Sequence, residues 1–344
     1  MKYAAVKRAG GAIAALTFVW LAGTIARPGV ASLGAGVASA QAPKIKVGRT
    51  TGASGFHLPT YVAMDRGLFK AEGLDAEFVN MTAGEIVRAT VAREVDFAPV
   101  PGASAEAMLK GAPLVFVVGE SLVSQWTLTT APGIKSVEDL RGKTLGLGRP
   151  GSADYGELVV VLAKFFKMEA GRDYKIINFR GEPERVAAII AGSIQGAALS
   201  FPHAARAEAE GLKILVKAGD HLPRLGGTIS THKDTVRDRR DAVRRFIRAV
   251  ARSTDYIRTE KTGTLEVIQK HFQLDGRVAE GFYNQIRDKF APQIPKDLFR
   301  QLFDSVATPE LGWPRDKPLP DVEQFVARDL LATTLRELGK PANE

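Results

Sequence analysis

The chain has 344 residues, with 47 Lys or Arg and 38 Asp or Glu, so its formal net charge is +9 at pH 7. No cysteine occurs, which excludes disulfide bonds, thiolate zinc sites and cysteine nucleophiles. The five histidines are scattered, and motifs for nucleotide loops, serine hydrolases and zinc proteases are absent. We therefore expect a binding protein rather than an enzyme, with no cofactor and no metal.

Residues 1–42 are typical of a secretory signal. A basic head precedes an uncharged apolar run over 11–26, and Ala-x-Ala sites end at Ala40 and Ala42. We expect cleavage after one of these residues and release into the periplasm, without a lipid because there is no cysteine to carry it, and with no stable membrane insertion afterwards. An uncleaved anchor is the alternative, but a bilayer span needs about 20 residues.

Beyond the signal, short apolar runs rich in β-branched residues alternate with helical patterns. The predicted strands are 44–49, 76–79, 97–100, 114–119, 144–148, 175–179, 197–200 and 213–217, and helices include 60–70, 85–93, 155–166 and 183–191. Such alternation is typical of β-α units around a mainly parallel sheet. From about residue 234 to residue 338 helices follow one another, which predicts an α/β body with a helical C-terminal portion.

The α/β part contains a faint internal repeat of about 100 residues. The run 44–48 resembles 143–148, a Gly-Glu pair occurs at 84–85 and at 181–182, and a proline closes the strands at 101 and at 202. The repeat predicts two similar lobes. Lobe 1 comprises 43–126 and 232–344, lobe 2 comprises 132–222, and the hinge crossovers are 127–131 and 223–231. We expect 127–130 and 227–231 to pair as a two-stranded hinge.

The basic run at 237–248 is the strongest cue for nucleic acid. Its charges fit the solvent-facing side of a long amphipathic helix, and basic runs alone are a weak signal. We therefore expect no nucleic-acid partner, only a general preference for anionic ligands.

Four loops rich in Gly and Ser follow predicted strands and precede helices. In an open parallel sheet such ends face one crevice, and helix N-termini bind anions there. The loops are 51–59 (TGASGFHLP), 82–84, 101–104 (PGAS) and 150–152 (PGS).

Side chains in and near these loops are the candidate ligand contacts. Gly151 lets the backbone approach a ligand, and Ser152 either donates its hydroxyl or only caps the helix. Arg180 follows a strand and suits a carboxylate, sulfonate or phosphate. Aromatic residues could pack against the carbon skeleton of a ligand or between the lobes. A histidine can pair with an anion or be a polar surface residue without a role in binding. The expected substrate-binding residues are Ser54, Gly55, Phe56, His57, Gly84, Pro101, Gly102, Ser104, Trp126, Gly151, Ser152, Tyr155, Arg180, Ser200, Pro202 and His203, with Arg49 and Arg149 as weaker candidates.

The segment 59–75 (PTYVAMDRGLFKAEGLD) resembles the signature of the nitrate/sulfonate/taurine class of ABC-importer binding proteins, the SsuA/THI5-like or NMT1-like family. Stretches at 95–98, 140–144 and 150–152 are also similar, and the likeness covers about 44–235. The signature itself describes packing, because its apolar residues form one helix face. It identifies a fold and specifies no ligand.

The resemblance implies a type II periplasmic binding-protein fold, in which two α/β lobes joined by a two-stranded hinge close on a small organic ligand. We expect this ligand to be an anion. The implied partners are an ABC permease and its ATPase. Enzymes on the same fold are the alternative, but the pyrimidine synthases use a cysteine-rich segment and the chorismate dehydratases are cytosolic. An effector lobe of a transcription regulator would need an N-terminal helix-turn-helix, which residues 1–42 do not resemble.

Overall fold

The structure, a computed structural model, describes residues 42–50, 54–150, 152–309, 312–314 and 316–342. Ala42–Glu344 forms one compact unit. The predicted signal falls almost wholly outside the described residues, since 1–41 are not among them. No helix in the described part is long and apolar enough to cross a membrane.

The strands form two groups, each the centre of one lobe. The strands are β1 (Lys44–Thr50), β2 (Asp75–Met81), β3 (Leu114–Val123), β4 (Trp126–Thr130), β5 (Thr144–Leu147), β6 (Lys175–Asn178), β7 (Gly196–Ser200), β8 (Lys213–Lys217) and β9 (Pro223–His232). In the second lobe, β6-β5-β7-β4-β8 form one sheet. In the first lobe, β1 pairs with β2 and β3 pairs with β9. Isolated bridges at Phe97 and Ala98 join β1 to β9.

The two lobes share one strand order, which confirms the repeat inferred from the sequence. The first lobe runs β2-β1-(97–98)-β9-β3, and the second runs β6-β5-β7-β4-β8. In both, the first pair is parallel and the fourth strand is antiparallel to its neighbours. The predicted strand at 97–100 is reduced to its two bridging residues, because Pro99 and Pro101 lack the N–H that a ladder needs.

The connection between the lobes is two-stranded, as predicted. The chain leaves the first lobe through Ser124-Gln125 and returns after 218–222, and Val123 pairs with Pro223 beside these crossings. The prediction that 127–130 and 227–231 pair with each other is wrong. The first segment pairs with β7 and β8, and the second with β3, because each completes the sheet of one lobe.

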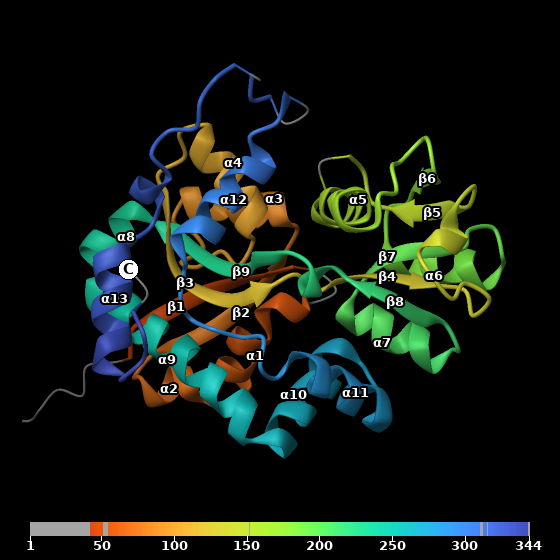
Figure 1. The fold of residues 1–344 in the computed structure, drawn as a ribbon. Helices are drawn as coiled ribbons and strands as arrows, with labels where there is room; N and C mark the ends of the chain where they lie inside the picture. Colours follow the sequence, from red (N-terminus) through yellow and green to blue (C-terminus); the bar gives the residue numbers. More distant parts are fainter. Residues whose placement is uncertain (1–41, 51–53, 151, 310–311, 315, 343–344) are drawn as a thin grey trace, which may run out of the picture. The chain divides into compact units, whose positions relative to one another are not determined.

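The helices cover both faces of each sheet. They are α1 (Leu58–Asp65), α2 (Leu68–Ala71), α3 (Ala83–Val91), α4 (Pro101–Leu109), α5 (Ala153–Phe166), α6 (Glu182–Ile190), α7 (Phe201–Ala209), α8 (Lys233–Asp238), α9 (Arg240–Thr259), α10 (Lys261–Phe272), α11 (Gly276–Ile286), α12 (Lys296–Val306) and α13 (Arg328–Glu337). In the second lobe α5 and α7 lie on opposite faces (Figure 1). Ala198 of β7 packs in the cluster of α5, whereas Ala197 and Leu199 pack with α6 and α7, which is the two-residue alternation of a strand buried on both faces.

The helical C-terminal portion packs mainly on the first lobe. Phe246 of α9 stacks on Phe97, with 3.6 Å between ring centroids. On the other side of the same helix, Arg248 and Arg252 contact Glu72 at 2.9 and 2.7 Å. The basic run, predicted to lie on one long helix, spans α8 and α9, and five of its arginines form ion pairs with carboxylates: Arg237, Arg239, Arg244, Arg245 and Arg248.

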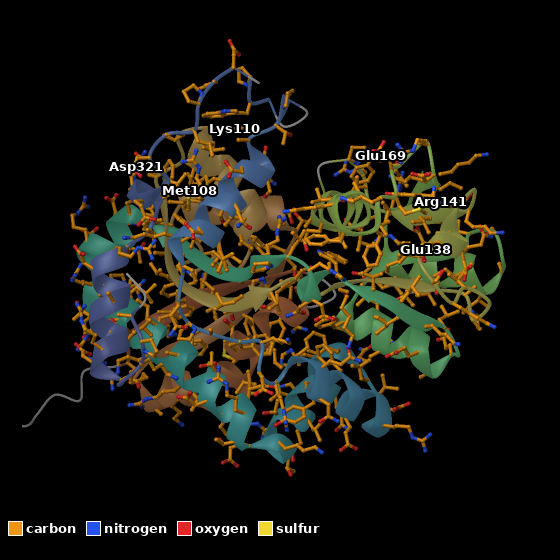
Figure 2. All side chains as sticks on the ribbon, in the orientation of Figure 1. Met108, Lys110, Glu138, Arg141, Glu169 and Asp321 are labelled. Carbon is orange, nitrogen blue, oxygen red and sulfur yellow. The ribbon has the colours of Figure 1, made fainter. Side chains whose placement is uncertain are left out.

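Charged residues at the outer end of the second lobe are also paired. Arg172 contacts Glu169 at 3.0 Å and Asp173 at 2.8 Å, and Arg141 reaches the same aspartate. Arg141 and Glu169 both lie at this end, near β5 and β6 (Figure 2).

Candidate functional site

One pocket of ≈ 310 Å³, here called the central pocket, lies where helices of both lobes begin. Helix starts carry unpaired N–H groups and a partial positive charge. The first residues of α3, α4 and α5 border it, together with the 3₁₀ turn at Gly55–His57 and the end of β1. Three of the four loops expected to converge contribute lining residues to this pocket, and the fourth, 150–152, directly precedes the lining residue Ala153 in the sequence. The lining residues are Thr50, Ser54, Phe56, His57, Ala83, Pro99, Val100, Pro101, Gly102, Ala103, Trp126, Ala153, Glu157, Arg224, Leu225, Gly226 and Leu302.

A larger pocket of ≈ 840 Å³, the second-lobe pocket, adjoins the strand ends of β5 and β6. Trp126 borders both pockets. The expected contacts Ser152 and Arg180 line it, as does Arg149. No carboxylate within the described residues forms an ion pair with either arginine, so both guanidinium groups can act on an anion. The remaining lining residues are Gly148, Asp154, Asn178, Phe179, Gly181, Glu182 and Arg185.

A buried ion pair shapes the loop between β5 and α5. Asp154 and Arg185 lie 2.6 Å apart, and each side chain is 5% exposed. Asp154 also accepts the N–H of Gly148 at 2.7 Å, and Arg185 donates to the carbonyl of Ala198 at 2.7 Å. Ser152 forms no side-chain cap on α5, and its hydroxyl donates to the Arg149 carbonyl at 2.7 Å. These bonds hold the loop in one shape at the edge of the second-lobe pocket.

The central pocket has one unpaired acceptor and one unpaired donor in its wall. Oε1 of Glu157 lies 3.0 Å from Nε of Arg224, which joins α5 to β9, but Oε2 has no hydrogen-bond partner among the described residues. Burial raises the pKa of Glu157, and the Arg224 charge opposes this shift. The indole Nε1 of Trp126 is also buried without a partner in the part of the chain that the structure describes. Buried polar atoms without partners are uncommon in folded proteins, so both atoms are candidates for ligand contact.

A second buried carboxylate orients His57 at the pocket wall. Glu120 of β3 is fully buried and contacts Nδ1 of His57. It also accepts the N–H and the hydroxyl of Thr60, at 3.1 and 2.6 Å, in the first turn of α1. A carboxylate at a helix start interacts favourably with the helix dipole. Glu120 therefore caps α1 and holds His57 in a single orientation.

Other expected contacts do not line the central pocket. Ser104 is buried and bonds to Ser230 at 2.8 Å, and the backbone N–H of Ser200 donates to Glu182 at 2.6 Å. A Cβ on Gly55 would lie 2.4 Å from Oε1 of Gln125, so this glycine permits a close approach between chain segments. Gly84 is the exposed second residue of α3, and Tyr155 packs at the edge of the second-lobe core. Pro202 and His203 line a third pocket, whereas Gly151 lies outside the described residues.

The sequence analysis did not identify the buried charged residues of the site. Glu120 stands within the apolar run 114–123, and an acid in such a run was the available signal. The remaining buried charged residues of the site belong to ordinary helix or strand patterns, and no neighbouring residue in the sequence indicates that they are buried. They are Asp154, Glu157, Arg185 and Arg224.

Solved structures resemble this chain at low sequence identity. The periplasmic aliphatic sulphonate binding protein SsuA from Escherichia coli is 16% identical, with a TM-score of 0.70 over 84% of this chain and 98% of that chain. The periplasmic nitrate-binding protein NrtA from Synechocystis PCC 6803 is 13% identical, with a TM-score of 0.68 over 88% and 91%. The desulfurization enzyme DSZB is 13% identical, with a TM-score of 0.64 over 86% and 99%. The chain thus has the expected type II periplasmic binding-protein fold.

No curated protein sequence matches the chain. The family model described as NMT1/THI5 like matches residues 55–261, which is more than half of the chain. The match includes the whole segment 59–75 that carried the resemblance, and it extends through α9 to the first residue of α10. This chain belongs to the NMT1/THI5-like family.

Proposed function

We propose that the protein is the solute-binding component of an ABC importer and that it holds a small organic anion between its lobes. The observation that carries this proposal is the meeting of helix starts from both repeats at the central pocket. Family membership and the resemblance to sulphonate- and nitrate-binding proteins support it. In this proposal a permease with its ATPase receives the ligand, and the chain catalyses no reaction.

The charges around the pockets favour an anion. Arg149 and Arg180 lack carboxylate partners in the described part of the chain, and helix starts add partial positive charge. Burial raises the pKa of Glu157, which favours its neutral form, and Arg224 lies 3.0 Å from the same carboxyl group as a compensating positive charge. Trp126 offers an N–H donor and an aromatic face where the pockets meet.

Closure of the lobes would complete the site. The lobe boundaries expected from the sequence, 43–126 with 232–344 and 132–222, remain part of the proposal. The movement would occur about the paired segments that join the lobes, at or beside 127–131 and 223–231. Few backbone angles change in such hinges.

A binding screen tests the function. The purified protein is heated with alkanesulfonates, nitrate, aromatic carboxylates and pyrimidines, and each stabilising compound is followed by calorimetry and by product analysis. We expect one chemical class to bind with a stoichiometry of one and to be recovered unchanged. Product formation without stoichiometric binding would instead support the enzyme alternative, which the resemblance to DSZB keeps worth testing.

The site is tested by substitution. Arg180→Ala removes a charged hydrogen bond worth about 1.5–3 kcal/mol, so we expect affinity to fall about tenfold or more. Arg277→Ala, at an exposed position on α11, is the matched control and should have no effect. Equal affinity in both variants would exclude Arg180 as a ligand contact.

We also propose that residues 1–42 direct export and are removed. N-terminal sequencing of the protein recovered from the periplasmic fraction should begin at residue 41 or 43. Recovery of the intact chain from the cytosol would contradict this part of the proposal.

A further inference from the structure

A third pocket, of ≈ 270 Å³, lies between the end of β1, the start of α7 and the end of α10. We call it the His271 pocket. It shares no lining residue with the central pocket or with the second-lobe pocket. Its walls come from both lobes, because α7 belongs to the second and β1 and α10 to the first. The lining residues are Arg49, Pro202, His203, Arg206, His271, Phe272 and Gln273.

Two arginines of this pocket lack acidic partners. Most arginines of the described chain form an ion pair with a carboxylate, but neither Arg49 nor Arg206 does within the described residues. Arg206 donates to the backbone carbonyl of Phe272 at 3.0 Å, which leaves its other N–H groups available. The Arg49 guanidinium lies over the rings of Tyr61 and Phe78, at 5.7 and 5.8 Å, and its Nε is buried without a hydrogen-bond partner.

His271 contributes a second unpaired atom. Its side chain is 3% exposed, and the ring stacks on Tyr61 with 4.7 Å between centroids. Nε2 lies 3.0 Å from Asp65, which assigns the ring proton to Nε2, whereas Nδ1 is buried and has no partner among residues that the structure describes. Burial lowers the pKa of His271, against the opposing effect of Asp65, and this shift favours the neutral ring. Nδ1 is then a hydrogen-bond acceptor.

The pocket therefore combines guanidinium donors with one buried acceptor. A fully deprotonated oxyanion would satisfy the arginines but would leave Nδ1 unpaired. An oxyanion that keeps one O–H group satisfies both. We propose that the His271 pocket is a second ligand site, separate from the transported solute, and that it binds a small oxyanion carrying a hydroxyl proton, as a protonated phosphate does.

Inorganic phosphate and sulfate provide matched probes, because both are tetrahedral oxyanions and at pH 7 phosphate alone keeps a proton. The purified protein is titrated with each salt by calorimetry at equal ionic strength. We expect saturable binding of phosphate at least tenfold tighter than that of sulfate. Absence of saturable phosphate binding, or equal affinity for the two anions, would overturn the proposal.

Two variants locate the binding. Arg49→Met should weaken phosphate binding at least tenfold, while Arg277→Met, which removes an exposed arginine on α11, should leave it unchanged. His271→Phe keeps an aromatic ring beside Tyr61 but removes the acceptor, so the preference for phosphate over sulfate should disappear. Unchanged phosphate affinity in Arg49→Met, or an unchanged preference in a folded His271→Phe protein, would place the phosphate elsewhere. Arg49 lines the His271 pocket and not the central pocket, so a loss of phosphate binding in Arg49→Met is distinguished from binding in the central pocket.

Discussion

The Asp154–Arg185 pair should be one of the most sensitive points of the second lobe. The two charges lie 2.6 Å apart and are almost fully buried. Asp154→Ala leaves the guanidinium with the Ala198 carbonyl as its remaining acceptor. Removal of one member of a buried pair costs about 3–5 kcal/mol, a large part of the roughly 5–15 kcal/mol by which most proteins are stable. Arg185→Met should cost a similar amount, since it strands the carboxylate.

The double variant Asp154→Ala/Arg185→Met distinguishes a buried pair from two independent contributions. Replacement of both members by apolar groups is often nearly neutral, so we expect the double variant to be more stable than either single variant. Urea unfolding followed by circular dichroism gives the three free energies. Arg300→Met is the control, because its pair with Asp304 is exposed and should contribute less than about 1 kcal/mol. Additive losses in the double variant, or single losses no larger than the control, would refute the reasoning.

Three further predictions concern the central pocket and the packing of the first lobe. Trp126→Phe removes the unpaired indole N–H, so affinity for the solute found in the screen should fall about two- to tenfold in calorimetry, with no such loss if the indole does not touch ligand. Burial raises the pKa of Glu157 in the folded state, so the wild-type protein loses stability as the pH rises and this carboxyl group ionises. Glutamine does not ionise, so the free energy of unfolding of Glu157→Gln relative to the wild type should rise as the pH increases from about 4 to 7. A difference that stays constant with pH would contradict the raised pKa. A Cβ at Gly119 would lie 2.0 Å from the Gln293 carbonyl oxygen, so Gly119→Ala should destabilise by about 1–3 kcal/mol in urea, whereas Gly281→Ala, in an open position on α11, should stabilise by about 0.5–1 kcal/mol; similar effects of the two would exclude the clash.

Local patterns were sufficient to predict most strands and helices. Alternating apolar runs and helix-start loops depend on neighbouring residues, and these are what a sequence displays. The predicted helix at 60–70 is interrupted because Gly67 adopts a positive φ of 67°. Glycine makes such a break possible, although the sequence does not show that the position uses it.

Strand partners were harder to predict, because they depend on the whole sheet. The segments 127–130 and 227–231 are both rich in Thr and β-branched residues, and either could pair with any free edge. The first segment pairs with β7 and the second with β3, and both of these strands lie elsewhere in the chain.

Buried charges were missed for a related reason. Glu120 lies 63 positions from its partner His57, and no residue near Arg185 in the sequence shows that its charge is neutralised by Asp154. The polar loops around the pockets were recognised because Gly, Ser and Pro mark them locally. The ion pairs that hold these loops in place become visible only once distant segments are in contact.

The pairing of β3 with the distant strand β9 has a consequence for biosynthesis. The long strand β3 has its partner in β9, which the ribosome adds more than a hundred residues later. Until then, the edge of β3 has no partner from its own sheet and the N-terminal half cannot reach its final form. Acquisition of the native state is thus delayed until most of the polypeptide has been made, and a truncated product ending before residue 223 should expose that edge and aggregate.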